Sequence, residues 1–125
     1  MTHRRVPVSF IATDDAERAR SFYCDVLGLE LVETSPFALV LDDGGHTLRV
    51  QIVEALDPAP FTAHGWQVDD IAAEIERLGG HGVEFQRFEH LPQDDAGVWA
   101  TPDGNKIAWF SDPCGNVLSF TEFAD

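Results

Sequence analysis

Five histidines and two cysteines are the side chains of this sequence best suited to bind a metal ion or act as nucleophiles. Cys24 falls in a helical pattern and Cys114 in a turn, with the spacing of neither a zinc site nor a disulfide framework. A catalytic thiol needs a base nearby, and the sequence places none beside either cysteine. Four histidines fall in the N-terminal tail, turns or loops, where solvated histidines are usual: His3, His46, His81 and His90. Only His64 lies in a predicted strand.

The composition indicates a globular protein with a strongly acidic surface. Its 125 residues are 44% hydrophobic, and 22 Asp and Glu against 8 Lys and Arg give a formal charge of −14. This charge repels nucleic acid and anionic membranes and attracts cationic ligands, although acidic residues also serve solubility alone. No stretch approaches the about 20 apolar residues of a membrane span, and the start lacks the pattern of a signal peptide. We therefore expect a soluble, cytoplasmic protein without nucleic-acid or membrane partners.

The first half of the chain reads as strand, helix and three further strands. The opening strand ends at Asp14 and Asp15, which can cap a helix whose apolar residues recur at helical spacing. Gly28 supplies the left-handed residue that ends this helix. Three strand-like runs follow, separated by "SP" and "DGGH": "LELVET", "FALVLD" and "TLRVQIV".

The same order restarts after a connector that contains Pro58 and Pro60. A strand, an Asp69/Asp70 cap and a helix ending at Gly79 and Gly80 are followed by four strand-like runs: "VEFQRF", "GVWAT", "KIAWFS" and "VLSFTEF". The two caps hold equivalent positions, so the halves repeat. The predicted fold class is α+β, with two tandem βαβββ modules at about 6–53 and about 62–123 in one domain, 1–125.

The repeat, with "FYCDVLGLEL" closing the first helix and "DPCGNVLSF" before the last strand, resembles the vicinal oxygen chelate superfamily. This group includes glyoxalase I, extradiol dioxygenases and bleomycin-resistance proteins. The resemblance extends from about Val6 to Glu122. It implies curved mixed sheets around a cup, and a homodimer in which two subunits complete the cups. Isomerases, dioxygenases, transferases and simple binders share the scaffold, so the activity does not follow from it.

The resemblance also implies where a metal would be held, and the residues at those places are unsuitable. The family's ligand positions in the first strand of each module fall on Val8 and Ala63, and the carboxylate positions on Arg49 or Gln51 and on Ser119. These residues offer at most an amide and a hydroxyl, so we predict neither metal nor cofactor. His64 lies one residue from a ligand position. It should face the helix or lie exposed at the rim, unless a bulge turns it into the cup.

Strand alternation predicts which side chains line the cup. The predicted ligand-binding residues are Phe10, Arg49, Gln51, Gln67, Trp99, Trp109 and Ser119. Of the aromatic residues that flank the strands, about half must fill the core. Trp99 and Trp109 are the better ligand candidates, because they lie on neighbouring strands on either side of the "PDGN" hairpin, where the resemblance implies groove walls.

The predicted function is metal-free binding of a small aromatic or heteroaromatic molecule, such as an antibiotic held by sequestration. The alternative is a lyase, isomerase or dioxygenase acting on a small oxo or aromatic substrate, with Arg49 holding an enolate or carboxylate. The predicted cup contains no general base for such chemistry. A third possibility is a scaffold or interaction domain. The sequence does not identify the ligand.

Overall fold

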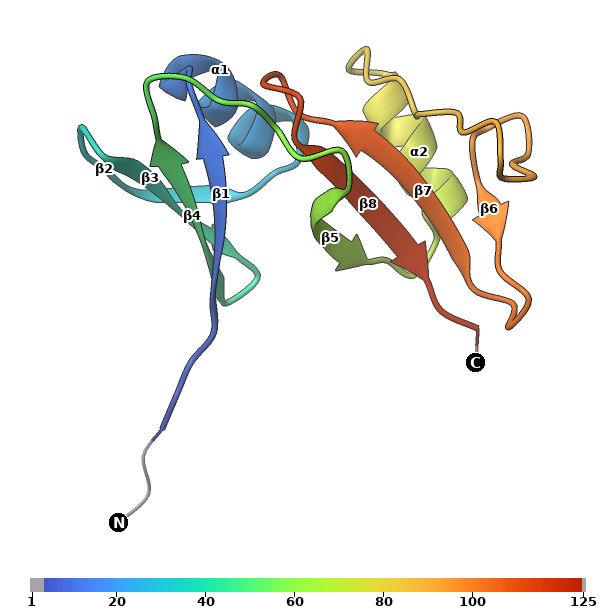
Figure 1. The fold of residues 1–125 in the computed structure, drawn as a ribbon. Helices are drawn as coiled ribbons and strands as arrows, with labels where there is room; N and C mark the ends of the chain where they lie inside the picture. Colours follow the sequence, from blue (N-terminus) through green and yellow to red (C-terminus); the bar gives the residue numbers. More distant parts are fainter. Residues whose placement is uncertain (1–3, 125) are drawn as a thin grey trace. The chain divides into compact units, whose positions relative to one another are not determined.

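The computed structural model describes residues 4–124 and divides into two compact units, Met1–Asp57 and Pro58–Asp125 (Figure 1). The division falls in the predicted proline-containing connector. Each unit contains a four-stranded mixed sheet and a helical segment, so the predicted α+β class and the repeat are confirmed. That the two modules act as one domain stays a prediction. We call them the N-terminal and the C-terminal unit.

The N-terminal unit pairs its first strand with its last. Its elements are β1 (Val8–Thr13), α1 (Ala16–Arg20), the π-helix η1 (Ser21–Val26), β2 (Glu30–Thr34), β3 (Ala38–Asp43) and β4 (His46–Ile52). The strand order is β1-β4-β3-β2, with β1 and β4 parallel and the other pairs antiparallel. A parallel pair needs a long crossover, and the helical segment with β2 and β3 supplies it.

The predicted first helix consists of two segments rather than one. The Asp15 side chain accepts a hydrogen bond from the Arg18 amide at 3.2 Å, which confirms the cap. The turn then widens, because the Leu27 amide donates to the Phe22 carbonyl five residues back at 3.0 Å. Gly28 ends the segment with φ +84°, as predicted.

The C-terminal unit repeats this arrangement with a longer helix. Its elements are β5 (Thr62–Gln67), α2 (Ile71–Gly79), β6 (Trp99–Ala100), β7 (Lys106–Ser111) and β8 (Val117–Glu122). The order is β5-β8-β7-β6, and β5 runs parallel to β8. Asp70 caps α2 by accepting from the Ala73 amide at 3.1 Å, as Asp15 caps α1. No helix within residues 4–124 has the length and apolar content to cross a membrane.

The prediction of a strand at "VEFQRF", residues 83–88, was wrong, and "GVWAT" shortens to the two residues of β6. The side chain of Gln93 takes the place of a neighbouring strand. Its amide donates to the carbonyls of Gln86 at 2.9 Å and Gly97 at 2.8 Å, and its oxygen accepts from the Phe88 amide at 2.6 Å. A side chain thus satisfies backbone groups that a β-ladder would otherwise pair.

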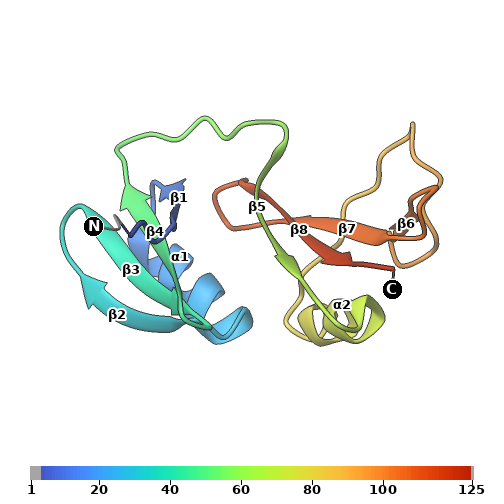
Figure 2. The same cartoon turned by 90° about the horizontal axis from the view of Figure 1, so that it is seen from below.

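Each sheet has one apolar face that lies toward the helix of its own unit, and we call this the helix face. We call the opposite face of each sheet the open face (Figure 2). Fully buried residues on the helix faces include Leu41, Leu48, Val50, Phe110 and Leu118. Their neighbours along each strand point to the other face, because strand side chains alternate. The open faces therefore carry the predicted site residues.

Candidate ligand-binding site

The open face of the N-terminal sheet brings together three of the predicted site residues. Phe10 lies directly across from Arg49, whose partner on the other side is Val40. Gln51 lies two residues further along the same strand, and both strands carry their side chains on this face. Phe10 is 58% exposed. Among residues 4–124, Arg49 makes no ion pair and no side-chain hydrogen bond, so its guanidinium is available to a ligand.

The open face of the C-terminal sheet places Ser119 between Gly65 and Trp109. Ser119 is only 8% exposed. A Cβ atom added to Gly65 would lie 2.5 Å from the Ser119 hydroxyl oxygen and 3.1 Å from its carbonyl oxygen. The hydroxyl thus occupies space that any other residue at position 65 would fill.

Trp109 is held by contacts on several sides. Its ring stacks with that of Trp99, with centroids 6.3 Å apart and planes at 24°. Phe88 meets it nearly at right angles, at 5.2 Å and 87°. The indole Nε1 donates a hydrogen bond to the Thr62 hydroxyl at 3.1 Å. The ring is therefore fixed in place before any ligand binds, which lowers the entropic cost of stacking on it.

A pocket of about 250 Å³ lies against Trp109 and Phe88. The other residues that line it are Pro60, Phe61, Thr62, His90, Leu91 and Val117. No Lys, Arg, Asp or Glu contributes to this lining. Drug-sized ligands usually occupy about 300–1,000 Å³, so this pocket suits one ring or one substituent of a larger molecule.

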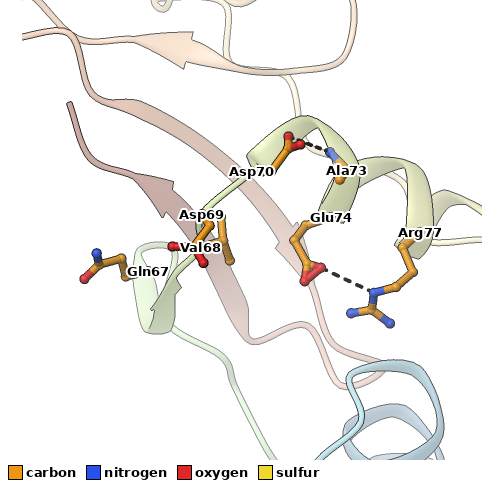
Figure 3. A pocket seen from close by; sticks show the side chains of 7 residues that line it. All are labelled: Gln67, Val68, Asp69, Asp70, Ala73, Glu74 and Arg77. Atoms are coloured by element: carbon orange, nitrogen blue, oxygen red, sulfur yellow. Dashed lines mark hydrogen bonds and ion pairs between the residues drawn. The ribbon is translucent and has the colours of Figure 1, made fainter. Parts of the chain in front are cut away.

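Gln67 lines a different hollow of the same unit, at the start of α2 (Figure 3). This hollow measures about 560 Å³. Three of its charged groups already have partners: Asp70 accepts from the Ala73 amide at 3.1 Å, and Glu74 pairs with Arg77 at 3.3 Å. Gln67 therefore does not lie with Trp109 in one pocket.

The sequence predicted that about half of the aromatic residues fill the core. Those outside the pocket lie partly in the core and partly on the surface. Phe85 and Phe110 pack in the core of the C-terminal unit with centroids 5.3 Å apart. Phe37 is exposed. The sequence did not indicate Phe61 and His90 as pocket residues, because both lie outside strands, where alternation carries no information.

His64 lies on the helix face of its strand. A register shift occurs between Thr62 and His64, but His64 pairs with the fully buried Leu118. Its ring meets that of Trp66, two residues along on the same face, at 4.8 Å and 90°. The bulge therefore leaves His64 facing away from the open face, as the sequence predicted.

Burial raises the pKa of the Cys24 thiol, and the Asp25 carboxylate raises it further, against an opposing effect of Arg20. The thiolate is the reactive form, so a raised pKa leaves little of it at neutral pH. This agrees with the absence of any predicted catalytic role for Cys24.

The two halves have the same order of strands and helix, and the sheet of each half has a helix face and an open face. This arrangement defines a paired βαβββ protein. The profile of the Glyoxalase/Bleomycin resistance protein/Dioxygenase superfamily matches residues 5–120. The chain therefore belongs to this superfamily. No curated protein sequence matches it significantly.

Three solved structures illustrate the similarity of fold. TnmS3, an antibiotic binding protein from Streptomyces sp. CB03234, is 23% identical with a TM-score of 0.73, covering 99% of both chains. A bleomycin resistance determinant encoded on the transposon Tn5 is 20% identical with a TM-score of 0.74, covering 95% of this chain and 98% of its own. Lactoylglutathione lyase from Agrobacterium tumefaciens is 21% identical with a TM-score of 0.73, covering 98% and 96%.

The residues at the superfamily's ligand positions do not fit a metal ion. Ser119 is covered by its approach to Gly65, and Arg49 carries a positive charge. Val8 and Ala63 have no donor atom in their side chains, and Gln51, the alternative to Arg49, offers only a neutral amide. Neither a hydroxyl packed against backbone nor a guanidinium is a usual ligand for a divalent ion.

We accordingly expect the purified protein to contain no stoichiometric Zn, Fe, Mn or Ni after desalting. Elemental analysis by plasma mass spectrometry will check this, with His64→Ala as the comparison variant. Near-stoichiometric metal that disappears in His64→Ala would show that this histidine is a ligand and that the assignment of strand faces is wrong.

Proposed function

We propose that the protein binds a small aromatic or heteroaromatic molecule without a metal ion and without converting it. The observation that carries this proposal is Trp109, whose ring is held by Trp99, Phe88 and Thr62 beside a pocket without Lys, Arg, Asp or Glu. A fixed indole with an apolar pocket beside it favours stacking over acid/base chemistry.

Two structural neighbours support sequestration as the purpose of binding. One is an antibiotic binding protein and another a bleomycin resistance determinant. By analogy, this protein would protect its host by holding a toxic compound. The formal charge of −14 favours a cationic ligand. The homodimer implied by the fold resemblance stays a prediction, which light scattering will check.

A tryptophan fluorescence screen tests the proposal directly. All three tryptophans, Trp66, Trp99 and Trp109, belong to the C-terminal unit. Trp66 packs near Phe110 and Phe120 in the core, so Trp66→Phe removes background from a residue that does not touch the pocket. Flat aromatic natural products and small oxo-acids are titrated into this variant. If no aromatic compound changes its emission below millimolar concentration, the proposal is wrong.

An enzymatic function is the second candidate, because Arg49 lies on an open face without an ion-pair partner among residues 4–124, and a lactoylglutathione lyase shares the fold. Arg49→Ala separates the two. An enzyme that uses Arg49 to stabilise an enolate should lose about 100-fold or more in kcat, whereas a protein that only binds shows no turnover with or without Arg49.

The measurement is product formation from each bound compound, by mass spectrometry, alongside the dissociation constant. Arg49→Lys serves as control because it retains the charge but not the planar, bidentate guanidinium. Turnover of a bound compound that Arg49→Ala abolishes would replace the binding function by the enzymatic one.

A further inference from the structure

We infer that the pocket beside Trp109 is an aromatic cage for an alkylated ammonium group. The inference rests on the proposed function, since it assigns the part of the ligand that this pocket holds. It specifies which cationic group the aromatic ligand carries and where that group binds.

The walls of the pocket have the geometry that a cation requires. The rings of Phe88 and Trp109 stand at 87° with centroids 5.2 Å apart. The contact is edge to face, so the edge of one ring covers part of the other's face. A group in the corner lies over the free face of one ring and beside the other, and a ring face attracts a cation within about 6 Å. Phe61 lines the same pocket and is 68% exposed, so a third ring is accessible to the group.

The charges of the C-terminal unit favour a cation, and neither Lys nor Arg lines the pocket. Residues 58–125 contain twelve Asp and Glu and three Lys and Arg, a formal charge of −9. Each basic residue has a partner elsewhere: Arg77 pairs with Glu74, Lys106 pairs with Glu122, and Arg87 donates to the Asp94 carbonyl. A cation therefore enters a negative field without a competing Lys or Arg at the pocket.

The polar groups of the pocket favour an alkylated ammonium over a primary one. The Thr62 hydroxyl already accepts from Trp109, so His90 is the other polar side chain of the lining. A primary ammonium carries three N–H donors and loses their bonds to water when buried among rings. A tertiary or quaternary ammonium has one N–H or none, and its methyl groups contact the rings. About 250 Å³ accommodates such a group.

Choline and 3,3-dimethylbutan-1-ol test the inference, because they differ only in a charged nitrogen that replaces a neutral carbon. Binding of each is followed by NMR through the indole N–H signals of Trp99 and Trp109. We expect choline to bind about fivefold or more tightly than its neutral counterpart. Phe88→Leu keeps an apolar side chain but removes one ring, and should abolish this preference. Phe88→Tyr keeps the ring and should retain it.

Equal or weaker binding of choline overturns the cage, as does a preference that Phe88→Leu leaves intact. Absence of binding by both probes overturns it as well. Far-UV circular dichroism verifies that the variants fold, and Phe61→Leu replaces Phe88→Leu if the latter unfolds. The fluorescence screen with flat, uncharged aromatic compounds runs in parallel. Stacking of those compounds with no choline preference disproves the cage alone, whereas failure of both disproves the proposed function too.

Discussion

Replacing Trp109 by alanine will weaken binding of the aromatic ligand at least about tenfold. A buried aromatic side chain contributes about 1.5–3 kcal/mol through burial and about 0.5–1.5 kcal/mol more through ring geometry. Each 1.4 kcal/mol is about a factor of ten in the dissociation constant. The substitution also removes the ring against which Trp99 and Phe88 pack. The dissociation constant is measured by isothermal titration calorimetry, which does not depend on the lost fluorophore.

Trp109→Phe is the matched control for this experiment. It keeps an aromatic face but loses the hydrogen bond from the indole to Thr62 at 3.1 Å. We expect an intermediate loss of affinity, because the ring remains but is less firmly held. Unchanged affinity in Trp109→Ala, with the circular dichroism of the native protein, would place the ligand elsewhere on the molecule.

Gly65→Ala should lower the free energy of unfolding of the C-terminal unit by about 1–3 kcal/mol, the usual cost of overpacking. The new Cβ would lie 2.5 Å from the Ser119 hydroxyl oxygen and 3.1 Å from its carbonyl oxygen. The hydroxyl can rotate away, but the carbonyl belongs to the β8 backbone and cannot move without disturbing its pairing with β5 and β7. Urea unfolding followed by tryptophan fluorescence measures the loss, since all three tryptophans report on this unit.

The double variant Gly65→Ala/Ser119→Ala separates the two clashes. Removing the hydroxyl should restore part of the stability lost in Gly65→Ala, and the remaining deficit reflects the carbonyl. Ser119→Ala alone is the reference. If the single and double variants are equally unstable, the close approach of the serine hydroxyl is not what requires glycine at position 65.

Patterns within strands and at helix ends predicted much of this fold. Alternation assigned Leu118 and Phe120 to the helix face and Ser119 to the open face. The strand register agrees, because Ser119 lies opposite Trp109 and Leu118 lies opposite the fully buried Phe110. The caps Asp15 and Asp70 were readable because a carboxylate before a helix has a specific backbone partner. Both signals depend on residues close in sequence, where geometry is set by the chain itself.

The features that were mispredicted or missed depend on contacts of individual side chains, which neither alternation nor helix capping predicts. "VEFQRF" has the composition of a strand, but the side chain of Gln93 binds backbone groups at Gln86 and Phe88 and replaces a ladder. The pocket is completed by Phe61 and His90, which lie outside the strands at separate places in the chain. Neither periodicity nor composition relates such residues to Trp109. A tertiary structure was needed to bring them together.

The pairing of β1 with β4 also has a consequence for how the chain is made. Every strand of the N-terminal sheet comes from residues 8–52, and every strand of the other sheet from residues 62–122. When the ribosome has extruded the first half, all partners of that sheet are already outside it. The first unit can therefore fold while the second is still being synthesised, so its apolar strands spend little time exposed without partners. Early closure of each ladder shortens the period in which nascent chains aggregate through unpaired strand edges.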